Sequence, residues 1–446
     1  MKMNVKKVAE KVYTPGGARG VVLTDEQKLR RSVLNCFLHE GEFYEDGDSI
    51  TDRLIGYAKK FDPEMVAKVA IEARTFGNVR HAPLLLIAEL AKRPDIKGLP
   101  TKIFNVIQRA DELSEFLLLF WKDREKQNVP RQVKLGLEMA MLKFDEYQFG
   151  KYARNNSVLP LKNVLRMVHP RPMDAAQSEI FRRLRHGELA IPDTWETALS
   201  AGADKKETFT RLMMEGKLPY MALLRNLRNM LQAGVDQELI RKSLMNVGAA
   251  RRVLPFRFLA AAKQVPQIEE MLSDAFIAFA NTNDKLPGKT VLIVDVSGSM
   301  GGVISGRSGM TGYDATFMLV SILREICEEV VIYATAGSDY KRKHATMLIP
   351  NRHTFALSDA LEKSCETIGR GGIFLKQVMD FVHSKEESFD RLVVITDEQD
   401  TSGDDSIFKV EFKCDKNYLI NVASCEVGIG YRDWVHIDGF SASSVE

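Results

Sequence analysis

The spacing of apolar residues predicts a helical first part of the chain. From residue 23 to about residue 280, apolar side chains recur at intervals of three and four, which is typical of one buried helix face. Thr24 and Gln27 fit a capping box, and Asp62-Pro63 fits the start of another helix. Further helices are expected near 80–92, 99–108, 111–126, 130–143, 160–168, 173–186, 205–215, 219–232, 235–246 and 266–280.

Many consecutive helices with short connections favour a stack of helix pairs. The sequence shows no clean repeating period, so an irregular α-helical bundle stays open as an alternative. The polar, turn-rich segment 281–289 ends the helical pattern. We therefore expect one domain over residues 1–284 and another over residues 289–446.

In the second domain, short apolar runs alternate with amphipathic segments. Strands are expected at 290–295, 330–335, 344–348, 391–396 and 417–423, and helices at 314–328, 357–367 and 373–383. This alternation predicts a doubly wound, mostly parallel sheet. The expected fold class is thus an all-α domain followed by an α/β domain.

Composition narrows the class of protein. A chain of 446 residues needs more than one core, and its apolar content of 45% is that of a soluble globular protein. No apolar run is long enough to span a bilayer, so we expect a cytoplasmic protein with no membrane partner. The five cysteines are scattered without C-x-x-C spacing, which argues against a disulfide framework or a zinc site.

The net charge of +2 hides an asymmetry. Residues 289–446 carry 16 Lys and Arg against 24 Asp and Glu, whereas residues 1–288 carry 46 against 36. A basic first domain indicates a polyanionic partner. Ordinary solvated helix faces would give the same count, and charge alone does not separate the two interpretations.

Two hydroxyls and an acid follow the first expected strand of the second domain. Asp295, Ser297 and Ser299 stand in the run V-L-I-V-D-V-S-G-S-M at the end of that strand, where α/β sheets place ligands. Their oxygens are hard donors that suit Mg²⁺ or Mn²⁺. A phosphate loop at 297–302 is the alternative, but the Gly-Lys-Ser/Thr ending is absent.

The segment 218–230 is an amphipathic helix with basic residues on its polar side. Arg225 and Arg228 are three residues apart and therefore share a face. They either bond carbonyls at helix ends or face a polyanion. Basic residues return shortly afterwards, at Arg251-Arg252 and at Arg257.

The D-x-S-x-S loop resembles the metal-ion-dependent adhesion site of von Willebrand factor A domains. The run 393–398, V-V-I-T-D-E, is similar to the strand that ends in that family's second acid, so the resemblance gives Asp397 that role. The family's third loop usually reads Gly-Gly-Thr, and here Ile373 replaces the threonine. Because isoleucine offers no oxygen, the resemblance implies an incomplete site for Mg²⁺ or another divalent cation.

Three segments resemble the TROVE module of the Ro autoantigen family: 221–227 (M-A-L-L-R-N-L), 254–259 (L-P-F-R-F-L) and 168–172 (V-H-P-R-P). Members of that family place a von Willebrand A domain after the TROVE module, which is the order here. The resemblance covers about residues 12–440, and the compact length is similar to that of bacterial or phage-borne members.

This resemblance implies a HEAT-like helical ring closed by the von Willebrand A domain, and a monomer. Its outer face would bind a Y-RNA-like small structured RNA, and its hole would bind single-stranded 3′ ends of misfolded non-coding RNA. The residues that resemble Y RNA contacts are Lys151, Arg154 and His169. Other basic candidates on that face are Lys162, Arg166, Arg171, Arg182, Arg183, Arg185 and His186, while Arg225 and Arg228 would line the hole.

Each candidate has a structural interpretation as well. His169 precedes a proline and fits a helix end, and the cluster 182–186 fits a solvated helix face. Arg182, Arg185 and His186 nevertheless share one face, as a surface that follows phosphates requires. The sequence identifies no aromatic platform for unpaired bases.

The expected function is a non-enzymatic RNA-binding scaffold for RNA quality control or processing, with an exoribonuclease or other RNA-processing enzyme as a further partner. One alternative is an adaptor whose metal site grips an acidic residue of a partner protein. The other is a metal-dependent phosphohydrolase or nuclease. The sequence offers no positioned general base and no second carboxylate cluster for that chemistry.

Overall fold

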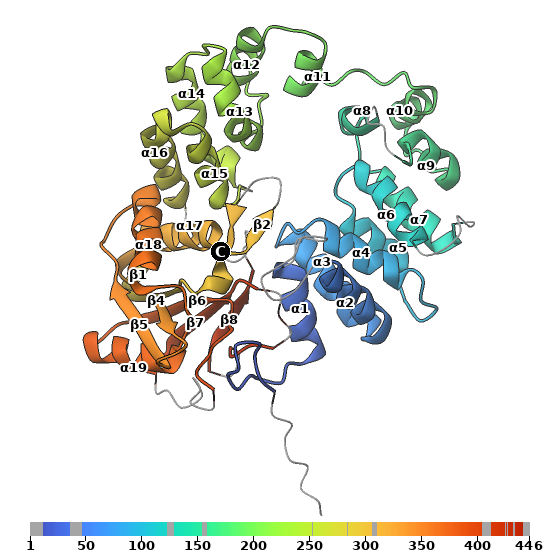
Figure 1. Ribbon diagram of the computed structural model, residues 1–446. Helices are drawn as coiled ribbons and strands as arrows, with labels where there is room; N and C mark the ends of the chain where they lie inside the picture. The colour runs from blue at the N-terminus through green and yellow to red at the C-terminus, as the bar shows by residue number, and fades with distance from the viewer. Residues whose placement is uncertain are drawn as a thin grey trace, which may run out of the picture.

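The computed structural model describes residues 12–35, 47–122, 129–153, 158–251, 253–282, 284–305, 310–403, 412–423, 425, 427–430 and 433–439. Its helices rise along one arm, cross at the top and descend along a second arm to a sheet domain (Figure 1). The two arms and the sheet domain together form a ring, which confirms the expected fold class.

The first arm is a stack of short helices around its own apolar core. The Thr24–Gln27 capping box is formed, with the Gln27 amide nitrogen 3.2 Å from Thr24 Oγ1. The helices are α1 (Asp25–Asn35), α2 (Gly47–Lys60), α3 (Pro63–Thr75), α4 (His81–Leu90), α5 (Leu99–Val106), α6 (Asp111–Trp121), α7 (Arg131–Met141), α8 (Glu146–Ala153), α9 (Leu161–Val168) and α10 (Ala175–His186).

The second arm descends to the sheet domain in six helices of the described chain. They are α11 (Trp195–Ser200), α12 (Lys205–Met214), α13 (Tyr220–Gln232), α14 (Gln237–Leu244), α15 (Phe256–Gln264) and α16 (Glu269–Ala280). In Figure 1, α13 and α15 lie on the side of this arm that faces the first arm. The segment 187–194 links the arms, because Ala190 bonds Glu146 of α8 and Asp193 pairs with Arg211 of α12.

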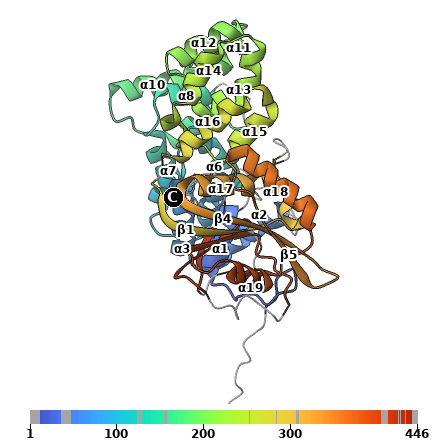
Figure 2. The same ribbon diagram turned by 90° about the vertical axis from the view of Figure 1, so that its left-hand side faces the viewer.

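The sheet domain has the expected doubly wound form. Its six-stranded sheet has the order β5-β4-β1-β6-β7-β8, in which β5 alone is antiparallel to its neighbour. The strands are β1 (Leu286–Asp295), β4 (Cys327–Ser338), β5 (Lys343–Leu348), β6 (Arg391–Thr396), β7 (Lys416–Asn421) and β8 (Val435–Asp438), and a small ribbon joins β2 (Val303–Ser305) to β3 (Met310–Thr311). Helices α17 (Gly312–Ile326) and α18 (Thr354–Ile368) cover one side and α19 (Leu375–Lys385) the other (Figure 2).

One apolar core runs from the second arm into the sheet domain. Phe258 and Phe276 of that arm stack edge to face, and Phe276 also lies 6.5 Å from Phe355 of α18. The same cluster includes buried residues of α17 and β1. Because the core is continuous, the second arm and the sheet domain should move as one body.

The first arm meets the sheet domain through polar contacts instead. Arg31 of α1 is fully buried, and its Nη1 lies 2.8 Å from Glu398 Oε1. Its Nε donates to the carbonyl of Cys425 at 2.8 Å, and His436 of β8 contacts the same Glu398 carboxylate. Burial alone would raise the pKa of Glu398, but the charges of Arg31 and His436 hold it at about 2. The ring is therefore closed here by a buried ion-pair network, which we call the Glu398 junction.

The helices expected from the sequence are confirmed, as are the five expected strands. Four helices were not expected: α2, α8, α11 and α15. The segment that becomes α15 looked like a basic turn because Pro255 and Arg257 stand at its start. Helix α6 ends at Trp121, before the residue 126 that periodicity suggested. Strand β1 begins at Leu286, inside the expected connection 281–289.

Candidate nucleic-acid interface and metal-site edge

The candidates for the outer RNA face lie on three helices in contact with one another, α8, α9 and α10. Helix α9 is strongly amphipathic. Its residues Leu161, Val164, Leu165 and Val168 are buried, whereas Lys162 and Arg166 are exposed and one turn apart. The structure thus places these two cations side by side on a solvent-facing surface. Lys151 of α8 is also exposed, with its ammonium 5.8 Å from the centre of the Tyr152 ring.

His169 ends α9 in the left-handed conformation, with a φ of 53°, and its amide donates to the carbonyl of Leu165. The structural role that the sequence allowed is therefore present, and the exposed ring remains available to a ligand. Arg171 is exposed two residues later, and its backbone amide is tied to Glu138. Arg154 lies outside the described residues.

The arginines of α10 differ sharply in their partners. Arg182 pairs with Glu179 at 2.8 Å and with Glu188 at 2.7 Å, and Arg183 pairs with Glu146 at 2.7 Å. His186 is exposed, and its Nδ1 lies 2.8 Å from the carbonyl oxygen of Arg182. By contrast, four exposed cations on α9, on α10 and between them have no ion pair to a described residue: Lys162, Arg166, Arg171 and Arg185. These four are the better candidates for phosphate contacts.

Arg225 and Arg228 are exposed on α13, a helix on the side of the second arm that faces the first arm (Figure 1). Neither donates to a helix-end carbonyl in the segments that the structure describes. Arg228 instead approaches Gln264 of α15, with Nη1 and Oε1 3.4 Å apart. Both arginines line a cavity of about 580 Å³ together with Arg257, which was not among the expected site residues. The sequence predicted that Arg225 and Arg228 share a helix face, but it did not predict α15, the helix that lies opposite this face.

The candidate metal residues come together at the carboxyl ends of β1 and β6. Asp295 is fully buried, accepting from the amide of Ser297 at 2.8 Å and from the hydroxyl of Thr396 at 2.6 Å. The Ser297 and Ser299 hydroxyl oxygens lie 3.2 Å apart. Burial, and then the charge of Asp295, raises the pKa of Asp397 well above its usual range, although the Ser299 hydroxyl opposes the shift.

This edge offers two carboxylates and two hydroxyls, and no cationic side chain lies among those four residues. Two neighbouring buried acids must share a proton or face a cation. Hard oxygen donors around buried negative charge fit a divalent ion. In the described residues, no group of three or more His, Cys, Asp and Glu side chains could hold a metal, so any ion here would keep several water ligands.

The loop 371–373, which corresponds to the third metal loop of von Willebrand A domains, directs its isoleucine away from this edge. The side chain of Ile373 is 1% exposed and belongs to the apolar cluster on the α19 side of the sheet, with Leu375 and Val378. Thr401 donates its hydroxyl to the Ile373 carbonyl at 2.8 Å. Because the isoleucine side chain carries no oxygen, Ile373 adds no ligand to the four residues at this edge, as the sequence indicated.

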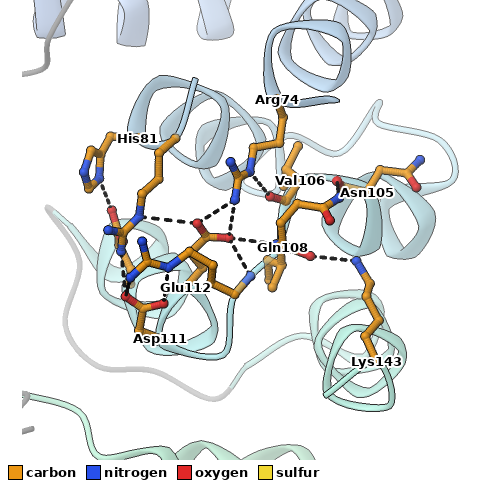
Figure 3. Close-up of polar contacts among 12 residues, drawn as sticks. Arg74, His81, Asn105, Val106, Gln108, Asp111, Glu112 and Lys143 are labelled. Atoms are coloured by element: carbon orange, nitrogen blue, oxygen red, sulfur yellow. Dashed lines mark hydrogen bonds and ion pairs between the residues drawn. The ribbon is translucent and has the colours of Figure 1, made fainter. Parts of the chain in front are cut away.

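Many arginines of the first arm are structural. Figure 3 shows Glu112, at the start of α6, as the centre of one such network, which we call the Glu112 network. Glu112 is fully buried, and its Oε1 lies 2.7 Å from Arg74 Nη2. Its Oε2 accepts from the amide of Gln108 at 2.7 Å, and Arg80 adds a second guanidinium at 3.3 Å. These cations hold α3, α4 and α6 together and are not available to a polyanion.

Comparisons with known proteins agree with this architecture. A family model described as "TROVE domain" matches residues 182–367, from α10 through the second arm to α18. The match crosses from the helical arm into the sheet domain, as the continuous core between them does. None of the helices in the described part of the chain is long and apolar enough to cross a membrane.

Curated relatives and a solved structure extend the likeness. "Telomerase protein component 1" of Rattus norvegicus is 33% identical over 47% of this chain, and that of Mus musculus is 38% identical over 19%. The matched segments span only 11% and 3% of those proteins. The crystal structure of the Deinococcus radiodurans RO (RSR) protein shares the fold with a TM-score of 0.61, at 20% identity over 95% of this chain and 98% of that one. The chain therefore contains a segment similar to the TROVE domain, and its overall fold is that of the RO protein.

Proposed function

We propose that this chain is an RNA-binding protein of the Ro type, a non-enzymatic scaffold that holds RNA at two places on its ring. A Y-RNA-like small structured RNA binds the outer face of α8–α10. Single-stranded 3′ ends of misfolded non-coding RNA enter from the inner side, where α13 and α15 lie. The scaffold would then present RNA to an exoribonuclease or another RNA-processing enzyme in the cytoplasm, as a monomer.

The observation that carries the proposal is the uneven pairing of the arginines. Several arginines of the first arm, such as Arg74 and Arg182, are neutralised by acids within hydrogen-bond distance. Exposed cations without a described acidic partner gather on α9 and α10 and again on the inner side of the second arm. A protein leaves such charges uncompensated where a polyanion supplies the counter-charge, because the like charges otherwise repel one another.

A filter-binding assay with a structured small RNA at several salt concentrations tests the outer site. Arg166→Glu should weaken retention at least tenfold, because it turns an attraction for phosphate into repulsion. Lys385→Glu is the matched control, since Lys385 lies at the end of α19 on the sheet domain, remote from both sites. Equal retention by the two variants, or retention that ignores salt, would refute the outer site.

A divalent cation at the Asp295 edge is a second part of the proposal. Asp295, Ser297, Ser299 and Asp397 would hold an ion of the Mg²⁺ type, with water in the place of the missing third-loop hydroxyl. Bound there, the ion would supply positive charge to a partner's carboxylate or phosphate. Burial raises the pKa of both acids, and the charge of Asp295 raises that of Asp397 further, so a cation would stabilise their ionised forms.

A metal-dependent protein adaptor remains the alternative function, and the same edge supports it. The burial of Asp295 and Asp397 weighs against it, because a partner's carboxylate would have to reach two residues that are at most 4% exposed. A pull-down from which EDTA and Asp295→Ala each remove the bound partner protein would favour the adaptor.

A further inference from the structure

The cavity between α13 and α15, which we call the α13/α15 pocket, has the composition of a binding site. Its volume of about 580 Å³ falls within the roughly 300–1,000 Å³ typical of small-molecule sites. Arg225, Arg228 and Arg257 line it, and Asn229 and Gln264 add two side-chain amides. None of its lining residues is acidic.

The three arginines come from two facing helices and point to a common ligand. Arg225 and Arg228 share the polar face of α13, whereas Arg257 lies in the first turn of the facing helix α15. In the described chain, none of the three has an acidic partner. Burial lowers the pKa of Arg257, and the positive charge of Arg225 lowers it further. Three like charges around one cavity therefore repel one another until an anion enters.

The rest of the lining suits the other parts of a nucleotide. Met221, Leu224 and Leu227 of α13 and Ala260 and Ala261 of α15 form an apolar floor on which a base or sugar can pack. The amides of Asn229 and Gln264 offer both donors and acceptors for the edge of a base. A simple inorganic anion would leave this apolar surface unused.

We propose that the α13/α15 pocket binds the terminal nucleotide of a single-stranded RNA through a terminal phosphomonoester. Guanidinium groups bind phosphate oxygens in pairs of parallel hydrogen bonds, so three of them can enclose one phosphate. A phosphodiester within the strand carries one negative charge, whereas a terminal phosphomonoester carries about −1.5 to −2 near pH 7. The dianion is the better match for three uncompensated cations. This inference rests on the proposed function, in that it names the end chemistry of the RNA on the inner side.

Fluorescence anisotropy with the full chain tests the pocket. Three internally labelled, unstructured octanucleotides of one sequence would be compared: one with a 3′-phosphate, one with a 5′-phosphate and one with hydroxyls at both ends. One phosphorylated oligonucleotide should bind at least about tenfold more tightly than the hydroxyl-ended one, which is the effect of one charged hydrogen bond. The two phosphorylated arms show which end the pocket takes.

Arg257→Gln should reduce this preference to less than about twofold, and Arg257→Lys should restore only part of it, because lysine keeps the charge but loses the paired donors. Arg211→Gln is the matched control, since Arg211 is an exposed arginine on the neighbouring helix α12 that pairs with Asp193. Circular dichroism of each variant would exclude unfolding as the cause. Retention of the structured small RNA should be unchanged in all three.

Several outcomes would overturn the inference. Equal affinity for the three oligonucleotides would mean that the protein binds only the phosphodiesters of the RNA backbone and has no site for a terminal phosphate. Displacement of the phosphorylated oligonucleotide by an acidic peptide at equal concentration would make the pocket a general anion site. If the oligonucleotides fail to bind while structured RNA is still retained, the inference is wrong and the outer site of the proposed function stands. If neither binds, the proposed function is wrong too.

Discussion

Loss of Arg31 should loosen the ring at the Glu398 junction. Its guanidinium is fully buried between the carboxylate of Glu398 and the carbonyl of Cys425, each 2.8 Å away. Arg31→Met keeps much of the length of the side chain and removes these bonds. The substitution leaves the Glu398 carboxylate buried, with the amide of Gly430 and the ring of His436 still in contact with it.

The size of the effect follows from that burial. Removing one partner of a buried ion pair costs about 3–5 kcal/mol. His436 continues to offset the charge of Glu398, so we expect the lower end of this range. The neighbouring Arg30→Met is the matched control, because Arg30 pairs with Glu26 and Glu72 where these side chains are about a third exposed. Such a pair is worth only about 0–1 kcal/mol.

Hydrogen exchange read by mass spectrometry separates local opening from global unfolding. The amide of Val21 bonds Gly428 beside the junction at 2.9 Å, and the amide of Gly430 bonds Glu398. In Arg31→Met these amides should exchange on the order of 100-fold faster, as a loss of about 3 kcal/mol implies. Amides of β6 should keep their protection. Equal acceleration in Arg30→Met, or in β6, would refute the view that a separable polar contact closes the ring.

Three further predictions follow from buried charges. Burial lowers the pKa of His436, but the charge of Glu398 outweighs burial and raises this pKa to about 9. The stabilisation by protonated His436 should therefore be complete below about pH 6.5 and lost as the pH rises through 9. In urea unfolding from pH 6 to 9, the free energy of unfolding should fall with pH, and His436→Gln should flatten this slope. Asp397→Asn should raise the melting temperature without metal, because it ends repulsion with Asp295, and should abolish any stabilisation by Mg²⁺ in the same thermal scan. Glu112→Gln should cost about 3 kcal/mol in urea unfolding at pH 7, because it leaves buried guanidinium groups without their carboxylate, and a loss below 1 kcal/mol would contradict the structural role of the Glu112 network.

Local rules predicted much of the fold because they act within a few residues. The capping box at Thr24, the cap of α3 by Asp62 and the amphipathic stripe of α9 all depend on spacing along one helix. The meeting of Asp295 and Asp397 was predictable as well. Asp295 ends β1 and Asp397 follows β6, and the carboxyl ends of such parallel strands share one edge of the sheet.

Such local rules do not predict which distant segments of the chain come into contact. No local pattern points to the partner of Arg31, which is Glu398, 367 residues later. The spacing of Arg225 and Arg228 gave their common face, but only the packing of α13 on α15 brings Arg257 opposite them. Periodicity assigns a side chain to a face of its helix, and the fold decides what covers that face.

The charge surplus of the first 288 residues therefore overstates the surface offered to RNA. Arg31 and Lys263 count toward that surplus, yet each pairs with an acid of the second domain, Glu398 and Asp314 respectively. On α9, on α10 and between them, four described cations remain without an ion pair, and each phosphate contact contributes about −0.9 to the slope of log K against log salt. If these four carry the outer site, its slope should lie near about −4, well short of what the whole surplus would give. The RNA footprint then depends on which arginines the fold leaves unpaired, and net charge is a poor guide to it.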